Sequence, residues 1–207
     1  MAKIGVFDSG MGGLSVANAL HVAFPDDQVI FENDVENLPY GLKTPAQLKE
    51  LATPHLRSLE SQHCDVIVVA CNTLSTTVIP DIRNDFSVPI VPVVPMVKPA
   101  CAQTNSKIVA VCATPTTLGS PRYSELKKEF GSGIEFLEPY CGDWAQMIES
   151  DEVDKEKVAS IINDVCEKGA DVIVLGCTHY HWIELLIKEL AKGRAIVIQP
   201  EQAIINH

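Results

Sequence analysis

The stretch that decides the fold is Asp65–Thr73 (DVIVVACNT), because Asp171–His179 (DVIVLGCTH) nearly repeats it. In both copies an aspartate precedes a short apolar run, which leads into a small residue, a cysteine and polar residues. A second pair, Lys3–Val6 (KIGV) and Lys107–Val111 (KIVAV), occurs in the same order at nearly the same separation. Buried strands of similar composition can recur by chance, but these copies also agree beyond the strand, at the turn. The repeat therefore predicts two similar half-structures, each with a cysteine directly after a strand.

Short runs rich in Val and Ile alternate with longer amphipathic stretches along the chain. The runs show little polar–apolar alternation, which is typical of strands covered on both faces. The predicted strands are Ile4–Phe7, Val29–Phe31, Val66–Ala70, Ile90–Val94, Ile108–Cys112, Ile134–Phe136, Val172–Leu175 and Ala195–Ile198, and the predicted helices are 14–23, 45–61, 74–86, 120–130, 143–150, 154–168 and 181–192. This rhythm favours an α/β fold: two similar parallel-sheet α/β lobes with a pseudo-twofold relation and the active site in the cleft between them.

The stretch Val88–Pro99 contains four prolines and is the predicted crossing point between the lobes. We therefore expect residues 1–95 to form the first lobe and residues 96–198 the second. The C-terminal tail, 199–207, is expected to return to the first lobe.

Composition narrows the class of protein. The 207 residues are 46% hydrophobic and 21% charged, which is ordinary for a soluble globular protein. No apolar run approaches the roughly 20 residues of a membrane span, and the first residues lack the features of a signal peptide. We expect a cytoplasmic protein without membrane contact. The net charge of -11 disfavours nucleic-acid binding but leaves a small anionic substrate open.

The seven cysteines are odd in number, and the chain has no C-x-x-C pair and no His/Cys spacing typical of zinc. A disulfide framework and a metal site are therefore not expected. Most of these thiols are predicted to be small core residues.

Cys71 and Cys177 are different, because ligands of parallel α/β sheets bind beyond the carboxyl ends of the strands. Each also precedes a predicted helix, whose N-terminus stabilises a thiolate and attracts a carboxylate. Thiols, with an ordinary pKa of about 8.5, can give and take protons near neutrality. Two thiols facing one carbon could remove a proton from one side and return it to the other, so the pattern indicates stereoinversion. The polar neighbours Asn72, Thr73 and Thr178 either bind a ligand or only cap the helices.

The first strand runs into a glycine-rich turn, Asp8–Gly13 (DSGMGG), which is neither a Walker loop nor a G-x-G-x-x-G motif. The turn suits anion binding, and a purely structural tight turn explains it equally well. Asp8 could activate a thiol or an ammonium group, or cap the following helix. We expect Asp8 to assist Cys71, and His179 to assist Cys177.

Three motifs, Phe7–Gly10 (FDSG), Ala70–Thr73 (ACNT) and Leu175–Tyr180 (LGCTHY), together resemble the aspartate/glutamate racemase superfamily, and within it the glutamate racemases. Pro39–Gly41 (PYG) matches a further substrate-loop motif of that family. The resemblance extends over nearly the whole chain.

This resemblance implies interconversion of L- and D-glutamate without pyridoxal phosphate, metal or another cofactor, supplying D-glutamate for peptidoglycan synthesis. It implies that Cys71 deprotonates the D-enantiomer and Cys177 the L-enantiomer, with Asp8, His179 and Glu149 assisting. Many members form dimers, so a homodimer is also implied. The implied substrate-binding residues are Asp8, Ser9, Tyr40, Gly41, Asn72, Thr73, Thr114, Thr117, Thr178 and His179.

Two features depart from the family pattern. The chain ends at His207, whereas relatives usually continue through a C-terminal helix that packs on the first lobe. The Cys-Thr-His-Tyr motif is normally followed by Pro, and here His181 and Trp182 follow it. Two alternatives therefore stay open: another enzyme of the superfamily, such as an aspartate or hydantoin racemase or a one-cysteine decarboxylase, and a non-enzymatic relative that binds a dicarboxylate or a protein.

Overall fold

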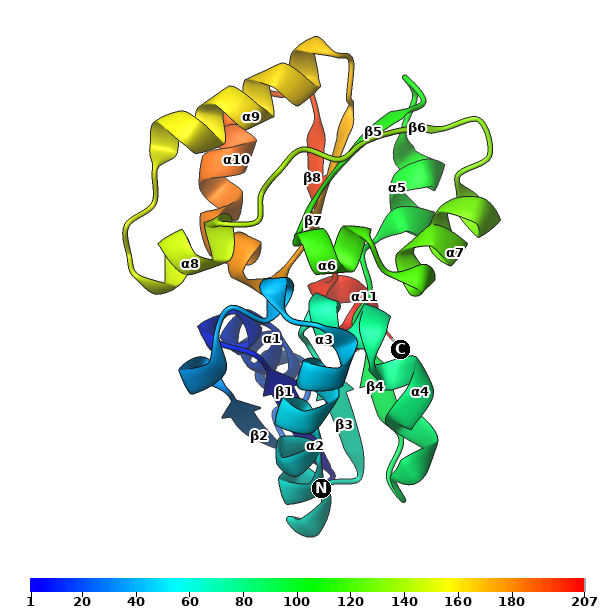
Figure 1. The fold of residues 1–207 in the computed structure, drawn as a ribbon, viewed down its shortest axis with the longest axis vertical. Helices are drawn as coiled ribbons and strands as arrows, with labels where there is room; N and C mark the ends of the chain where they lie inside the picture. Colours follow the sequence, from blue (N-terminus) through cyan, green and yellow to red (C-terminus); the bar gives the residue numbers. More distant parts are fainter. Residues whose placement is uncertain (207) are drawn as a thin grey trace.

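The computed structural model describes residues 1–206 and contains two four-stranded parallel sheets (Figure 1). The first has the order β2-β1-β3-β4 and the second β6-β5-β7-β8, so the two sheets match strand for strand. This confirms the predicted α/β fold of two similar parallel-sheet lobes. The strands are β1 Lys3–Asp8, β2 Gln28–Asn33, β3 Val66–Val69, β4 Ile90–Pro92, β5 Ile108–Ala113, β6 Glu135–Leu137, β7 Val172–Gly176 and β8 Ile196–Ile198.

The aspartate that opens each repeat fixes the start of a neighbouring strand. Asp65 accepts a hydrogen bond from the backbone N–H of Lys3 at 2.7 Å, and β3 pairs with β1. Asp171 accepts from the backbone N–H groups of Asn105 and Ser106 at 2.7 and 2.8 Å, just before β5, which pairs with β7. Partial burial opposes ionisation, but these donors and the Thr104 hydroxyl hold the pKa of Asp171 at about 2.

Helices cover both sheets, and their amphipathic faces explain the core. In α9, for example, Val158, Ile162 and Val165 recur at helical spacing and are buried against the second sheet. The α-helices are α1 Leu14–Ala23, α2 Pro45–Ser61, α3 Asn72–Thr77, α4 Ile79–Ile82, α5 Val97–Gln103, α6 Pro115–Leu118, α7 Pro121–Phe130, α8 Trp144–Glu149, α9 Lys155–Glu167, α10 Glu184–Ala191 and α11 Glu201–Ile205; the 3-10 helices are η1 Met11–Gly13, η2 Val35–Asn37, η3 Tyr40–Leu42, η4 Arg83–Asp85 and η5 Thr178–Ile183.

Two helix predictions need correction, and helices α5, α6 and α11 were not predicted. The expected helix 74–86 is divided into α3, α4 and η4, because Pro80 in the first turn of α4 cannot donate to the turn before it. The expected helix 181–192 becomes α-helical only at Glu184, after the 3-10 helix η5. Helix α5 was not predicted, because its segment is rich in proline. Pro99 is tolerated there because it lies in the first turn, where N–H groups have no partner within the helix.

The chain passes from the first sheet to the second between β4 and α5, within the proline-rich stretch. Near its end the chain comes back to the first sheet, where Ile204 and Ile205 of α11 pack on a cluster that includes Val16 and Leu20 of α1. Figure 1 shows α11 beside the boundary between the two lobes. His207, the last residue of the predicted tail, lies outside the described residues.

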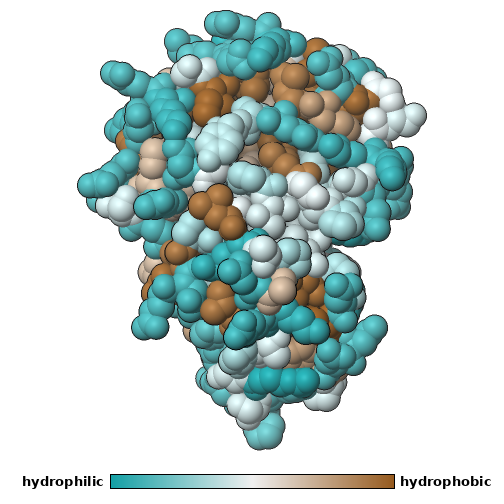
Figure 2. All heavy atoms as spheres, viewed as in Figure 1, coloured by the Kyte–Doolittle hydropathy of each residue, from teal (hydrophilic) through white to brown (hydrophobic). Residues whose placement is uncertain are grey.

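Hydrophilic and intermediate side chains dominate the face shown in Figure 2, and hydrophobic residues form separate small groups on it. Among residues 1–206, none of the helices combines the length and apolarity that crossing a membrane requires.

Candidate active site

Both candidate cysteines line one buried cavity of about 20 Å³ between the lobes. Cys71 follows β3 and is 4% exposed, and Cys177 follows β7 and is 7% exposed. A volume of this size holds about one water molecule, so an amino acid can enter only if the walls move apart. The lining residues are Ser9, Leu38, Pro39, Tyr40, Gly41, Cys71, Asn72 and Thr73 from the first lobe, and Thr114, Gly142, Ala145, Cys177, Thr178 and His179 from the second.

The Cys71 thiol has neutral surroundings at hydrogen-bonding distance. Its Sγ lies 3.5 Å from the hydroxyl oxygen of Ser9. Burial, followed by the negative charge of Asp8, raises the pKa of Cys71 to about 12, although the Ser9 hydroxyl and the Leu74 N–H act in the opposite direction. Cys71 is therefore held as a thiol at neutral pH and is suited to donate a proton.

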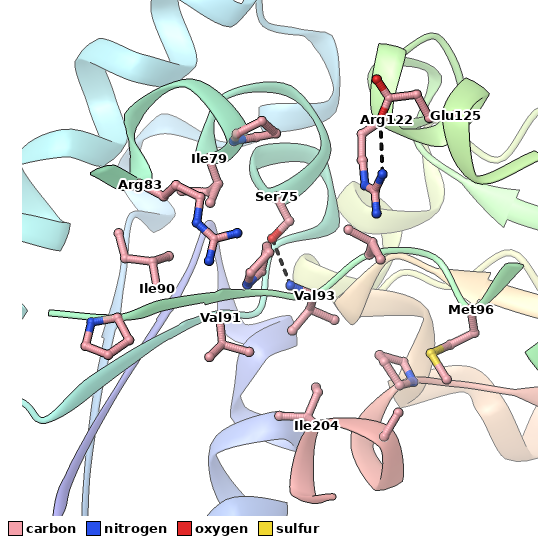
Figure 3. A pocket seen from close by; sticks show the side chains of 16 residues that line it. Ser75, Ile79, Arg83, Ile90, Val91, Val93, Met96, Arg122, Glu125 and Ile204 are labelled. Carbon is pink, nitrogen blue, oxygen red and sulfur yellow. Dashed lines mark hydrogen bonds and ion pairs between the residues drawn. The ribbon is translucent and has the colours of Figure 1, made fainter. Parts of the chain in front are cut away.

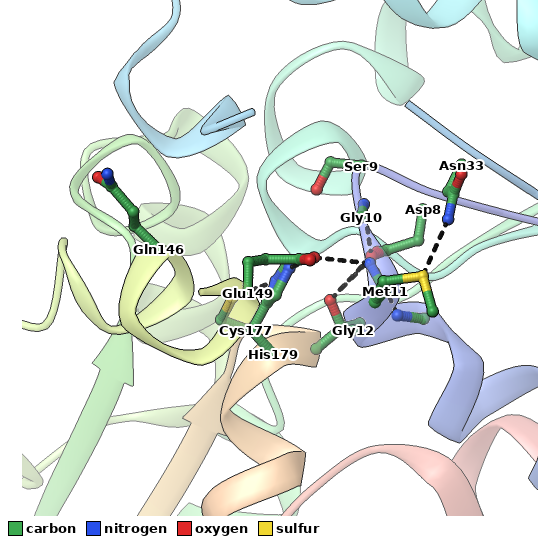
Figure 4. A network of polar contacts seen from close by, with 12 residues as sticks. Asp8, Ser9, Gly10, Met11, Gly12, Asn33, Gln146, Glu149, Cys177 and His179 are labelled. Carbon is green, nitrogen blue, oxygen red and sulfur yellow. Dashed lines mark hydrogen bonds and ion pairs between the residues drawn. The ribbon is translucent and has the colours of Figure 1, made fainter. Parts of the chain in front are cut away.

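The Cys177 sulfur has a charged neighbour. His179 places Nδ1 3.7 Å from Cys177 Sγ and Nε2 2.6 Å from Glu149 Oε1, in an arrangement seen in Figure 4. Burial disfavours the imidazolium, but Cys177, Glu149 and Asp8 outweigh it and raise the pKa of His179 to about 10. The hydrogen bond from His179 lowers the pKa of Glu149, which also accepts from the Met11 N–H at 2.7 Å. His179 is therefore a protonated ring at neutral pH and is the charged group beside the Cys177 sulfur.

Asp8 is fully buried and fastens the glycine turn to the second lobe. Its Oδ2 accepts from the backbone N–H groups of Gly10 and Gly13 at 3.1 and 3.0 Å, and its Oδ1 accepts from the Thr178 hydroxyl at 3.1 Å. Within residues 1–206, Asp8 makes no hydrogen bond to Cys71. Its carboxylate acts on that thiol only through its charge.

Threonine hydroxyls join the lobes on another side of the cavity. Thr73 Oγ1 lies 2.9 Å from Thr114 Oγ1 and 3.3 Å from Thr117 Oγ1. Thr114 also caps α6 by accepting from the Thr117 backbone N–H at 3.2 Å. Thr116 donates to the Gly41 carbonyl at 2.6 Å, which attaches the substrate-loop motif to the second lobe.

Asn72 presents an unpaired amide at the cavity wall. Its side chain is 2% exposed, and neither its amide nitrogen nor its amide oxygen has a hydrogen-bond partner in the part of the chain that the structure describes. Buried amides are normally paired, because an unpaired one costs about 1–3 kcal/mol. The Asn72 amide is thus free to bind polar groups of a substrate.

The structure brings most of the predicted site residues to the cavity wall. Asp8, Glu149 and Thr117 instead lie one layer behind it, bonded to Thr178, His179 and Thr114. Four lining residues were not predicted as site residues: Leu38, Pro39, Gly142 and Ala145. Pro39 belongs to the Pro39–Gly41 motif, whereas no local sequence pattern distinguishes the other three, which are apolar or small, from packing residues.

A larger cavity of about 820 Å³ lies elsewhere, along β4, α4, α7 and α11 (Figure 3). Its walls are mostly aliphatic, with Arg83 and Arg122 beside them, and neither candidate cysteine lines it. Volume alone therefore does not locate the chemistry of this protein.

Comparison with known proteins identifies the family of this chain. A family model described as Asp/Glu/hydantoin racemase matches residues 15–207. The glutamate racemase of Deinococcus radiodurans is 35% identical, over 99% of this chain and 72% of its own length. That of Methylococcus capsulatus is 33% identical, over 99% of this chain and 77% of its own.

Solved structures extend the comparison. Escherichia coli glutamate racemase, in complex with L-glutamate and the activator UDP-MurNAc-ala, matches with a TM-score of 0.90 and 29% identity over 99% of this chain and 80% of that one. The Francisella tularensis enzyme in complex with D-glutamate gives 0.83 and 28%, over 99% and 78%. An aspartate racemase of Picrophilus torridus, at 16% identity, TM-score 0.65 and full coverage of both chains, shares the fold. From the family match and relatives above 30% identity across nearly all of the sequence, the chain belongs to the Asp/Glu/hydantoin racemase family.

Proposed function

We propose that the protein interconverts L- and D-glutamate, using Cys71 and Cys177 as its two acid/base groups and no cofactor. The observation that carries the proposal is the shared cavity, because two thiols from different lobes line the same buried space. The relatives named glutamate racemase, two of which are solved with L- or D-glutamate, support this substrate.

The unequal surroundings of the two sulfurs give the direction of the first proton transfers. A Cys177 thiolate beside the His179 imidazolium removes the α-proton from one face of the substrate carbon. The Cys71 thiol delivers its proton to the opposite face. After this turnover Cys71 is the thiolate and Cys177 the thiol, and exchange with solvent or the reverse reaction restores the starting form.

The same cavity provides hydrogen bonds for the substrate. Asn72, Thr73, Thr114 and Thr178 supply amide and hydroxyl groups, and we assign them to the carboxylates and to the charge that develops on the deprotonated carbon. Substrate entry replaces the contacts between Thr73 and Thr114 with contacts to the ligand. Ser9, Tyr40, Gly41 and His179 complete the binding wall, and Asp8, Glu149 and Thr117 support it from behind.

By family resemblance we assign the D-glutamate product to peptidoglycan synthesis, in the cytoplasm. A homodimer stays a prediction, which light scattering of the purified protein can check.

Circular dichroism tests the proposed reaction. L-Glutamate incubated with the purified protein and no added cofactor should lose its optical activity, and proton NMR in D₂O should show exchange of its α-hydrogen. Cys71→Ser and Cys177→Ser should each reduce racemisation by about 10³-fold, because each removes one of the two acid/base groups. Cys101→Ser, the same change at a half-buried cysteine outside the cavity, should retain activity.

Two results would contradict the proposal. Racemisation of L-aspartate but not of L-glutamate would assign a different substrate within the family. Full turnover by both single cysteine variants would remove the two-thiol mechanism.

A further inference from the structure

His181 is a buried histidine that the proposed reaction does not use. Its side chain is 3% exposed and lies in η5, two residues after His179. Nδ1 lies 3.0 Å from the hydroxyl oxygen of Ser15 in α1 and 3.6 Å from Glu201 Oε1 in α11. Nε2 has no hydrogen-bond partner among residues 1–206. This one imidazole therefore contacts the second lobe's catalytic segment, the first lobe and the C-terminal helix.

The donors and acceptors indicate the tautomer of His181. Ser15 has one hydroxyl proton, and the Gly12 carbonyl at 3.2 Å and the Glu201 carboxylate are its acceptors. When either of these acceptors receives that proton, the Ser15 oxygen accepts from His181, and Nδ1 then carries the hydrogen. The nearby His181 ring lowers the pKa of Glu201, with burial opposing and with Gln199 and Ser15 contributing, so the carboxylate stays charged.

These contacts act on the catalytic segment at short range. A side chain on Gly12 would lie within 3 Å of Thr178 and of the His179 backbone nitrogen, so the glycine turn and η5 are packed backbone against backbone. Ser15 holds the Gly12 carbonyl from one side, and His181 holds Ser15 from the other. Loss of the His181 contacts would therefore weaken the packing of η5 against the glycine turn, and this packing positions His179.

We propose that His181 and Glu201 are positioning residues, which clamp η5 onto the glycine turn and hold His179 at its distance from Cys177. Helix α11 is therefore part of the support of the active site, through Glu201. The expected effect of these residues on catalysis rests on the proposed function, whereas their contacts are independent of that function.

Four variants of the whole chain test this inference. His181→Phe keeps a flat ring but loses the donor, and it should lower kcat about tenfold with less than a twofold change in KM. His181→Asn places an amide N–H near the position of Nδ1 and should recover most of the activity. Glu201→Gln should lower kcat about threefold. Glu184→Gln makes the same change in a side chain of similar exposure that pairs with Lys188 instead, and it should match the wild type.

A second measurement does not require racemase activity. Iodoacetamide at low extent of reaction, with peptide mass spectrometry, gives the initial alkylation rates of Cys177 and Cys71. Both thiols line the same cavity, so opening of the cavity affects both rates and their ratio reports local reactivity. His181→Phe should lower the Cys177-to-Cys71 ratio about tenfold, and His181→Asn should restore it.

An unchanged ratio and kcat in His181→Phe would overturn the inference, as would a fall in melting temperature with no change in either quantity. If the wild type does not racemise glutamate, the proposed function fails, but the alkylation ratio still decides whether His181 and Glu201 position His179.

Discussion

The two cysteines occupy matching places in two lobes of the same strand order, yet their surroundings differ. Cys177 faces an imidazole that is itself bonded to a carboxylate, whereas the hydrogen-bonding side chain beside Cys71 is the neutral hydroxyl of Ser9. The chain after Cys71 forms an α-helix, and the chain after Cys177 forms a 3-10 helix. The two lobes therefore share the strand order and the position of the cysteine, but the side chains that contact each cysteine differ.

This difference has a physical reason under the proposed mechanism. Inversion at one carbon needs a base on one face and an acid on the other at the same moment. Two thiols in identical surroundings would favour the same protonation state, and one half of the reaction would lack its partner. Different neighbours let the two cysteines take opposite roles in the proposed reaction without changing the fold.

The largest expected effect comes from removing the charged neighbour of Cys177, and it is compared with the removal of the neutral neighbour of Cys71. His179→Asn removes the cation beside Cys177 and should lower kcat by about 10²–10³-fold. Ser9→Ala removes one neutral hydrogen bond near Cys71, worth about 1 kcal/mol, and should lower kcat about tenfold or less. Circular dichroism of L- and D-glutamate measures both variants.

An internal check accompanies this comparison. Enantiomers have equal free energy, so each variant must lose the same factor in kcat/KM in both directions. Equal losses for His179→Asn and Ser9→Ala would show that the two sides of the cavity are chemically alike, contrary to the structure.

A smaller effect tests how Asp8 acts on Cys71. Because the Asp8 carboxylate is one cause of the raised pKa of Cys71, Asp8→Asn should lower that pKa from about 12. At a fixed pH near 8, more of Cys71 would be thiolate, and its alkylation by iodoacetamide should be several-fold faster. Peptide mass spectrometry measures this rate.

Glu149→Gln is the matched control, because Glu149 contacts His179 and Met11 rather than the Cys71 side. It should leave the alkylation rate of Cys71 unchanged. Slower alkylation of Cys71 in Asp8→Asn would mean that the carboxylate promotes the thiolate, as the sequence led us to expect.

The smallest expected effect concerns stability. It compares Asp65 and Asp171, the aspartates that open the two repeats and hold neighbouring strands in place. The pKa of Asp171 is about 2 in the folded protein, below its ordinary value of 3.8. Its contribution to the free energy of unfolding is therefore complete above about pH 4 and is lost as the pH falls toward 2. Asp171→Asn should cost about 1–2 kcal/mol at pH 7 and much less near pH 2.

Asp65→Asn should cost less at pH 7, because Asp65 accepts one backbone N–H where Asp171 accepts two and a hydroxyl. Urea unfolding at both pH values gives these differences. A larger loss of unfolding free energy for Asp65→Asn than for Asp171→Asn would show that the number of hydrogen bonds does not determine which aspartate contributes more.

Local sequence was enough to predict the lobes, the strand positions and the place of both cysteines. Buried parallel strands have a composition that is visible in a short window, and the repeat fixes their correspondence. The glycine turn and the motifs around Cys71 and Cys177 are contiguous, so they too could be identified before the structure.

Only the tertiary structure decided which residues meet. Asp8 bonds to Thr178, Glu149 accepts from Met11, and His181 reaches Ser15, each across a large separation in sequence. Leu38, Gly142 and Ala145 reach the cavity because of how the lobes pack, and their residue types carry no signal of it. Periodicity describes the neighbours of a residue along the chain, whereas hydrogen bonds between lobes depend on how two completed sheets are placed against each other.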